Sequence, residues 1–147
     1  MQQNNFTYSF TTAKTAHEVF QLLSDPRQWW SGVYNETITG SDKSIKDEFT
    51  FLAGEGMHFS KQKLVELITD KKIVWEVTES NLRFLKDTNE WTGSKLTFDI
   101  TTEDAVTKIT FTHEGLVPAI ECYSECSNGW MQYLTKLKNK LNEPVNA

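Results

Sequence analysis

The stretch SKLTFDITTEDAVTKITFTHE, residues 94–114, alternates apolar and polar side chains on both sides of a short turn. Strict alternation of this kind is typical of a half-buried β-strand. The turn at residues 102–104 is far shorter than the crossover that a parallel pair of strands needs. The stretch therefore predicts two antiparallel strands, residues 94–102 and 107–113. The side chains expected on their inward face are Leu96, Phe98, Ile100, Ile109, Phe111 and His113.

Similar alternation occurs earlier in the chain, between short turns that carry Gly, Asp, Lys or Ser. Short turns again favour antiparallel neighbours. The strands predicted there are residues 6–11, 35–40, 48–52, 57–68 and 72–78, the last with a continuation through Leu82 and Phe84. Together with the first pair they predict a curved antiparallel sheet of about six or seven strands.

Helices are predicted on either side of the meander that follows the first strand. Thr15 and Glu18 have the spacing of a capping box, which marks the start of a short helix. Asp25 followed by Pro26 marks a second short helix, because proline fits the first helical position. A long amphipathic helix is predicted over residues 118–141. A sheet must bury one face, and only this last helix is long enough to cover it, so the predicted fold class is α+β.

Length and composition limit the possible functions. A chain of 147 residues fits one domain, residues 1–147. The net charge of −5 argues against a nucleic-acid partner, which would need clustered positive charge. No apolar run is long enough for a membrane span or a signal peptide, so a cytoplasmic protein is expected. The oligomeric state stays open between a monomer and a homodimer.

Aromatic residues are abundant, with five Trp, nine Phe and four Tyr. Trp75, Trp91 and Trp130 belong to different predicted elements that the fold would bring together. Each of them can serve as ordinary core, but five tryptophans exceed what a core of this size requires. Indole N–H groups can also orient the polar end of a ligand. The aromatic pattern therefore favours a cavity that binds a small hydrophobic molecule.

His113 and two cysteines are the remaining candidates for chemistry. Cys122 and Cys126 lie one helical turn apart, and three interpretations stay open: buried lining, a reactive thiol and a metal site. We expect both thiols to be reduced and free of metal, because free cysteine usually behaves as a small hydrophobic side chain and a disulfide inside a regular helix has poor geometry. His113 has no second acid or base predicted beside it, which favours a structural role. We expect no catalytic residue and no cofactor.

Motifs along nearly the whole chain resemble the START-like superfamily, also called SRPBCC or birch-pollen-allergen-like. Within it, the sequence is most similar to bacterial homologues of the C-terminal domain of the activator of the heat-shock-protein ATPase. The matching stretches are DP…WW (25–30), DEFTF (47–51), VWEVTES (74–80), EWTG (90–93), TFTHEGL (110–116) and ECY…GW…YL (121–134). The resemblance implies a helix-grip fold, in which the sheet wraps round the last helix and leaves an apolar cavity between them.

The resemblance also implies a candidate site and several functions. The implied cavity lining is Trp30, Phe51, Trp75, Trp91, Phe111, His113, Cys126 and Trp130. Members of this superfamily carry lipids, bind hormones, cyclise polyketides or assist chaperones in the stress response, so the fold alone does not fix the activity. The expected function is binding of a small hydrophobic or aromatic ligand without catalysis. Two alternatives stay open: a chaperone-associated interaction module, and a cyclase- or hydratase-type enzyme that uses His113.

Overall fold

Seven strands and three helices make up the computed structural model of the protein, which describes residues 5–41, 43–118 and 120–142. The strands are β1 (Phe6–Thr12), β2 (Thr37–Gly40), β3 (Glu48–Ala53), β4 (His58–Ile68), β5 (Lys72–Leu82), β6 (Lys95–Glu103) and β7 (Val106–Glu114). The helices are α1 (Ala16–Leu23), α2 (Pro26–Trp29) and α3 (Tyr123–Leu141).

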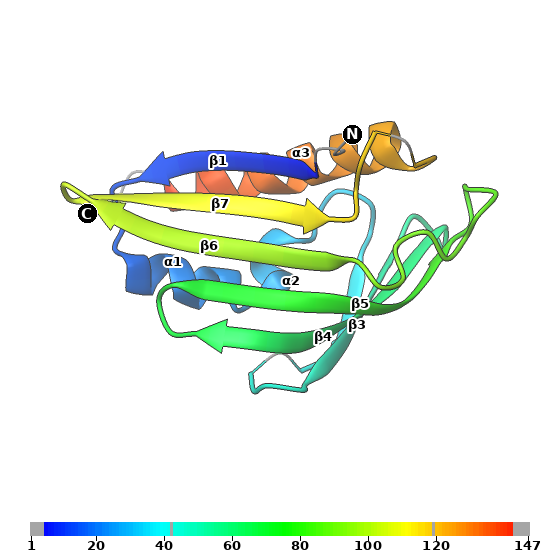
Figure 1. Ribbon diagram of the computed structural model, residues 1–147, viewed down its shortest axis with the longest axis horizontal. Coiled ribbons are helices and arrows are strands. Elements are labelled where there is room, and N and C mark those ends of the chain that lie inside the picture. Colours follow the sequence, from blue (N-terminus) through cyan, green and yellow to red (C-terminus); the bar gives the residue numbers. More distant parts are fainter. Residues whose placement is uncertain (1–4, 42, 119, 143–147) are drawn as a thin grey trace.

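The strands form one antiparallel sheet in the order β1-β7-β6-β5-β4-β3-β2 (Figure 1). The hairpin predicted from residues 94–114 is confirmed, because Phe98 lies opposite Phe111 in the pairing of β6 with β7. The first strand pairs with the last, and Phe6 lies opposite His113. The two ends of the chain's β region therefore meet, and β1 and β2 are left as the two edges of the sheet.

Two register shifts interrupt the pairing of β4 with β5, one between Lys61 and Gln62 and one between Leu64 and Glu66. β-Bulges of this kind bend a strand and increase its twist. In Figure 1, β3 accordingly turns away from the direction of β6 and β7. On β5 the first shift falls between Val77 and Glu79. The core-facing residues of β5 are therefore at odd positions up to Val77 (Ile73, Trp75 and Val77) and at even positions beyond it (Ser80 and Leu82).

The two short helices begin where the sequence predicts. The Thr15 hydroxyl accepts a hydrogen bond from the Glu18 backbone N–H at 3.1 Å, and the capping box is complete. Pro26 opens α2. Figure 1 shows all three helices on one side of the sheet, with α3 running along β1 and β7. The α+β helix-grip fold is confirmed.

The start of α3 corrects the sequence-based prediction. The helix begins at Tyr123, five residues after the predicted start at Pro118, and Cys122 is its N-cap residue. The Glu90 carboxylate accepts hydrogen bonds from the backbone N–H groups of Glu121 at 3.0 Å and Cys122 at 2.7 Å. These N–H groups are therefore capped by the loop between β5 and β6. A cap supplied from a distant segment leaves no local signal in the sequence.

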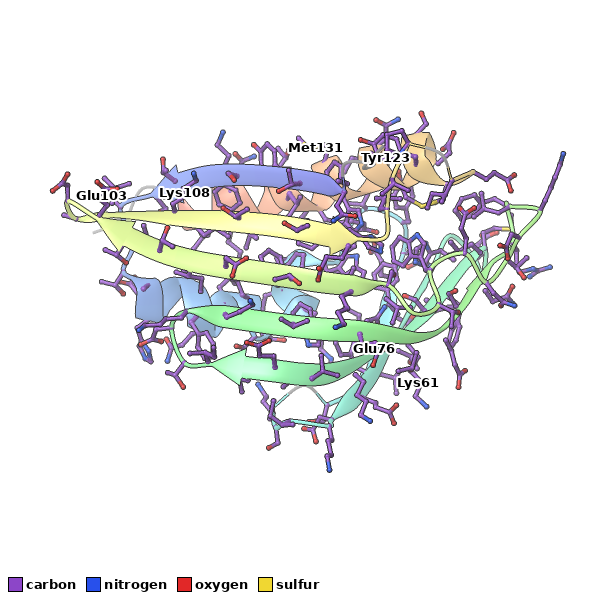
Figure 2. The ribbon with its side chains drawn as sticks, in the orientation of Figure 1. Lys61, Glu76, Glu103, Lys108, Tyr123 and Met131 are labelled. Atoms are coloured by element: carbon purple, nitrogen blue, oxygen red, sulfur yellow. A yellow bond between two sulfur atoms is a disulfide. The ribbon has the colours of Figure 1, made fainter. Side chains whose placement is uncertain are left out.

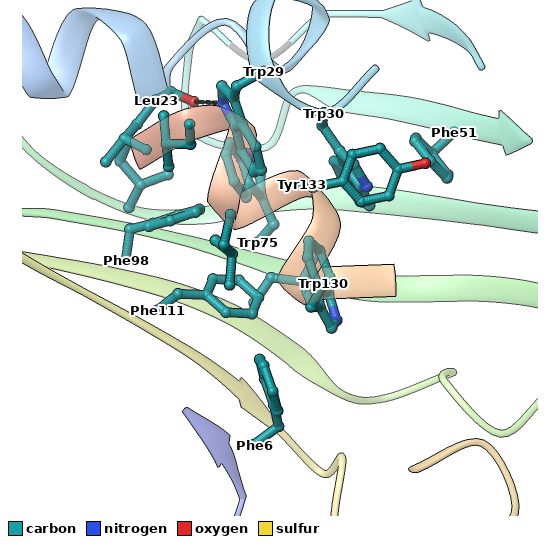
Figure 3. Packing of buried hydrophobic residues seen from close by; sticks show 14 of the residues in the cluster. Phe6, Leu23, Trp29, Trp30, Phe51, Trp75, Phe98, Phe111, Trp130 and Tyr133 are labelled. Atoms are coloured by element: carbon teal, nitrogen blue, oxygen red, sulfur yellow. Dashed lines mark hydrogen bonds between the residues drawn. The ribbon is translucent and has the colours of Figure 1, made fainter. Parts of the chain in front are cut away.

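The core lies between the sheet and the helices and is largely aromatic (Figure 3). Trp75, Phe98 and Phe111 are almost completely buried on the inner face of the sheet. Trp29 packs edge-on against Phe98, with ring centroids 5.3 Å apart. Its indole N–H donates to the Leu23 carbonyl at 3.3 Å, which joins α2 to the end of α1. Large aromatic side chains thus fill much of the core, as the composition suggested.

Polar side chains cover much of the outer face of the sheet (Figure 2). Hydroxyl pairs link β1 to β7, for example Ser9 with Thr110 at 3.0 Å. Lys61 and Glu48 form an ion pair at 3.8 Å between β4 and β3. Within the described ranges, no helix combines the length and the apolar character that crossing a membrane requires.

Candidate functional site

A cavity of about 500 Å³ opens between the first half of α3, strands β3 and β4, and the loop after β5. Five of the eight residues predicted to line a cavity do so. They are Trp30, Phe51, Trp91, Cys126 and Trp130. The other lining residues are Tyr34, Ala53, Gly54, Met57, His58, Phe84, Leu85, Glu121, Glu125, Gly129 and Tyr133.

Four of the predicted residues form one stack of rings, the aromatic wall: Phe51, Trp30, Trp130 and Trp91. Phe51 and Trp30 stack with centroids 4.2 Å apart and planes 17° apart. Trp30 and Trp130 follow at 5.0 Å and 32°, and Trp130 and Trp91 at 5.8 Å and 6°. The rings come from β3, the end of α2, α3 and the β5–β6 loop. The fold therefore brings four distant segments together as one wall of the cavity.

Trp75 and Phe111 lie outside the cavity lining. Trp75 is 1% exposed and packs edge-on against Phe49 at 5.6 Å, and Phe111 is completely buried. Phe111 contacts the back of the wall through Trp130, with centroids 4.5 Å apart (Figure 3). Phe111 therefore supports the wall directly, whereas Trp75 reaches it through Phe49, which packs edge-on against Trp30 at 6.1 Å.

His113 also lies behind the wall. The Trp130 indole N–H donates to His113 Nδ1 at 3.0 Å, and His113 Nε2 lies 2.9 Å from the Ser94 hydroxyl oxygen. Indole nitrogen is only a donor, so Nδ1 carries no proton and Nε2–H donates to Ser94. The Ser94 hydroxyl in turn donates to the Trp91 carbonyl at 2.6 Å. Burial, with a smaller effect from His58, lowers the pKa of His113 to about 3. His113 is therefore a neutral residue whose two ring nitrogens both position the wall.

His58 is a lining residue that the sequence analysis missed. Its ring packs edge-on against Trp91 at 4.6 Å and against Phe51 at 5.2 Å, at the two ends of the aromatic wall. Burial lowers the pKa of His58 to about 4, so the ring is neutral near pH 7. Its Nε2 atom is buried and has no hydrogen-bond partner among the described residues. The lining thus includes a neutral imidazole whose buried Nε2 has no partner among the described residues.

Residues 31–36, which we name the latch, connect α2 to β2 and hold α3 at the cavity. The Glu36 carboxylate accepts hydrogen bonds from the backbone N–H groups of Gly32 at 2.6 Å and Tyr34 at 2.8 Å, and from the Tyr133 hydroxyl of α3. Burial raises the pKa of Glu36, but the hydrogen bonds from Tyr133 and the latch backbone outweigh it, and the pKa is lowered. Burial and the Glu36 contact raise the pKa of Tyr133. The latch therefore holds a carboxylate and a neutral phenol together.

The cysteine pair corrects a second prediction. Cys122 and Cys126 are joined as a disulfide across the start of α3, with Cα atoms 5.4 Å apart, so the expectation of two reduced thiols is wrong for this structure. That Cα distance is within the range that a disulfide spans. Cys122 precedes the first residue of α3 but already has helical backbone angles, and its carbonyl accepts a hydrogen bond from the Cys126 N–H at 2.7 Å, so the disulfide spans one helical turn. Cys126 Sγ also accepts a hydrogen bond from the Trp91 indole N–H at 3.3 Å.

The mouth of the cavity exposes apolar side chains. Tyr34, Met57 and Phe84 line it and are 44%, 41% and 40% exposed. Phe84 was predicted to continue the strand that becomes β5, but the strand ends at Leu82 and the turn carries Phe84 to the surface. Apolar groups grouped at an opening usually mark a binding surface.

The arrangement can enclose an apolar molecule and offer it few polar groups. Among the described residues no three His, Cys, Asp or Glu side chains are grouped as metal ligands would be. An acid–base pair would need free nitrogens on His113, and both of them are bonded within the protein.

Comparisons with known proteins agree with this fold. The sequence profile of the Activator of Hsp90 ATPase homolog 1-like protein family matches residues 13–142. The comparison with curated protein sequences found no match. Among solved structures, the chain is similar to that of the Aha1 dimer from Colwellia psychrerythraea, with 19% identity, a TM-score of 0.74, and 97% of this chain and 99% of that chain covered.

Two further structures show the same likeness. A protein from Chromobacterium violaceum is 18% identical with a TM-score of 0.72, and 97% of this chain and 99% of that chain are covered. A protein from Mesorhizobium loti is 15% identical with a TM-score of 0.73, and 97% of this chain and 100% of that chain are covered. The TM-scores show a shared fold, and at these low identities the likeness shows the fold alone. The family profile covers most of the sequence. The chain therefore belongs to the Activator of Hsp90 ATPase homolog 1-like protein family.

Proposed function

We propose that the protein binds a small hydrophobic or aromatic molecule in the cavity between the sheet and α3, without catalysing its conversion. The observation that carries the proposal is the cavity of about 500 Å³ behind an apolar mouth, with the aromatic wall along one side. Cavities that hold small ligands usually have volumes of roughly 300–1,000 Å³ and mostly apolar linings. A core that only needed to be stable would fill such a space, because voids cost packing energy.

The polar groups of the site limit the kind of ligand. His58 Nε2 is buried beside the wall without a partner among the described residues. A buried polar atom is stabilised when it forms a hydrogen bond. A flat or aliphatic ligand with one hydroxyl, carbonyl or amine group would supply that bond while its apolar part contacts the rings.

Titration with a neutral apolar dye, N-phenyl-1-naphthylamine, tests the proposal. Bound dye should fluoresce more strongly and should quench the emission of Trp30, Trp91 and Trp130. Denatured protein serves as the control and should show neither change. Native mass spectrometry of protein purified from its own host would identify a retained molecule. A folded protein that neither binds the dye nor carries a molecule would contradict the proposal.

The family assignment supports a second proposal, a chaperone-associated interaction module. The sequence profile that matches residues 13–142 is named for activators of a chaperone ATPase. A pull-down with the heat-shock chaperone of the host, followed by an assay of its ATPase rate, tests this role. If a variant whose cavity is filled still stimulates the chaperone ATPase, the chaperone role does not depend on ligand binding.

A further inference from the structure

Acidic side chains stand at the cavity where α3 begins. Glu121 and Glu125 both line it and are exposed to solvent. Glu121 is held in place because one of its carboxylate oxygens accepts a hydrogen bond from the Lys86 backbone N–H at 3.0 Å. The Glu125 carboxylate makes no hydrogen bond to any residue in the part of the chain that the structure describes. A negative charge at the mouth is therefore left for a ligand to neutralise.

Positive charge is absent from the described lining of the cavity, although the Arg83 guanidinium lies near the mouth, 3.8 Å from where a Cβ atom would stand at Gly56. No lysine or arginine is among the described residues that line the cavity. His58 is the one basic side chain of the lining within the described ranges, and burial lowers its pKa to about 4, so it is uncharged near pH 7. An anionic ligand would therefore find no cation inside the cavity.

Two backbone N–H groups just before α3 are not open to an anion. Free N–H groups at a helix start usually attract negative charge. Here the N–H groups of Glu121 and Cys122 already donate to the Glu90 carboxylate. Glu90 thus satisfies these donors and adds a further negative charge close to the mouth.

The remaining lining is rich in aromatic rings, and an aromatic ring attracts a cation through its face. The rings of the aromatic wall stack on one another and are 1–3% exposed, so they offer an apolar surface and not open faces. Tyr34, which also lines the cavity, is 44% exposed and can offer its ring to an ammonium group. Carboxylates combined with an exposed tyrosine ring are a chemistry that recognises an organic cation.

We propose that the ligand of the cavity is an organic cation, an apolar or aromatic body that carries an amine or quaternary ammonium group. This inference rests on the proposed binding function and adds the charge of the ligand. The apolar body lies against the aromatic wall, and the ammonium group lies at the mouth between the Tyr34 ring and the carboxylates of Glu121 and Glu125.

Three naphthalene probes of similar size test the inference: one with a methylene-trimethylammonium group, one with a neopentyl group and one with a carboxymethyl group. At physiological ionic strength the cation should bind about fivefold more tightly than the neutral probe, and the anion should bind least. In the double variant Glu121→Gln/Glu125→Gln this preference for the cation should fall to within about twofold.

A variant at the far end of the sheet controls for net charge. Glu103 is exposed at the tip of the β6–β7 hairpin, away from Tyr123 at the start of α3 (Figure 2). Glu103→Gln/Asp104→Asn in this turn removes two negative charges, as the double variant at the cavity does, and should leave the preference for the cation unchanged. If it lowers the preference as much as the double variant does, the effect is non-specific and the inference is wrong.

The remaining outcomes separate the inference from the proposed function. Binding of the neutral probe with no preference for the cation, or with a preference for the anion, would overturn the charge assignment and leave ligand binding in place. Failure of all three probes and of N-phenyl-1-naphthylamine to bind would overturn the proposed function, and the inference with it.

Discussion

The indole nitrogen of Trp130 lies 3.0 Å from Nδ1 of His113, so a residue of α3 and a residue of β7 share one buried hydrogen bond. Trp130 is 2% exposed and His113 is 1% exposed. This bond fixes the orientation of the Trp130 ring, and with it the middle of the aromatic wall. It also fixes the tautomer of His113, whose Nε2–H donates a hydrogen bond to the Ser94 hydroxyl.

Trp130→Ala should lower the free energy of unfolding by about 3–5 kcal/mol, because it removes a large buried aromatic side chain. Trp130→Phe should cost about 1–3 kcal/mol, because the ring is retained but His113 Nδ1 loses its donor. Urea denaturation of both variants, and of each combined with His113→Leu, measures the coupling. A Trp130→Ala protein as stable as the parent would show that α3 does not hold the sheet, and strictly additive effects would exclude the hydrogen bond.

Stability should fall as the pH is lowered from about 7 to about 5. Burial lowers the pKa of His58 to about 4, and burial with the nearby His58 lowers that of His113 to about 3. Unfolded histidine titrates near pH 6.5, so below that pH the unfolded chain binds more protons than the native protein. Each histidine should therefore lower the free energy of unfolding by up to about 1.4 kcal/mol for each pH unit below about 6.5. His58→Phe should reduce this slope in urea titrations at several pH values, and an unchanged slope would contradict the burial of His58.

Most of the fold could be predicted from local patterns. Alternation in residues 94–114 gives β6 and β7, and the Thr15–Glu18 capping box gives the start of α1. His58 was missed because the inward positions at the start of β4 are polar: they hold His58, Ser60 and Gln62, and the last two hydrogen bond to each other. Polar residues at alternate positions indicate a solvent-facing side when only the sequence is read.

The rest of the site depends on contacts between distant segments. Glu90 and the start of α3 are about thirty residues apart, and Glu36 and Tyr133 are 97 residues apart. No local pattern records such pairs. The resemblance placed Trp30, Phe51, Trp91 and Trp130 together, but it could not tell residues that line the cavity from residues that are buried behind them. Trp75, Phe111 and His113 face the same side of the sheet as the wall, but they are buried in the core and do not line the cavity.

Gly129→Leu should block the cavity while the fold remains intact. A Cβ atom at Gly129, which lines the cavity from α3, would meet no heavy atom within 4 Å. Dye affinity should fall by more than about tenfold, and stability should hold or rise by about 0.5–1 kcal/mol, because glycine disfavours a helix interior. Gly129→Ala is the matched control and should gain stability while it still binds the dye. A Gly129→Leu protein that binds as the parent does would place the dye elsewhere.

The latch should loosen when its link to α3 is removed. Tyr133→Phe deletes the hydroxyl that donates to Glu36 and should cost about 1–2 kcal/mol. Amide hydrogen exchange at Gly32 and Tyr34 should become faster, because the carboxylate that accepts their hydrogen bonds loses an anchor. Met131→Leu, a partly buried change on α3 with a similar volume, serves as the control. Equal exchange rates in the Tyr133→Phe protein and the parent would show that Glu36 holds the latch alone.

The cysteine pair predicts a simple mass measurement. Protein purified without reductant should be lighter than reduced protein by the mass of two hydrogen atoms, and it should resist alkylation until reductant is added, because Cys122 and Cys126 are joined. Cys122→Ser should leave Cys126 as a free thiol that takes up one alkyl group in unfolded protein. Two alkylated thiols in untreated, unfolded parent protein would show that the pair is reduced.

The open position at Gly129 has a consequence for how this fold changes during evolution. A side chain introduced there would project into the cavity and need not disturb the sheet, the aromatic wall or the start of α3. The open volume can therefore change in one mutational step without an unstable intermediate. Among related chains with similar backbones, the residue at this helix position would set how much of that volume stays open.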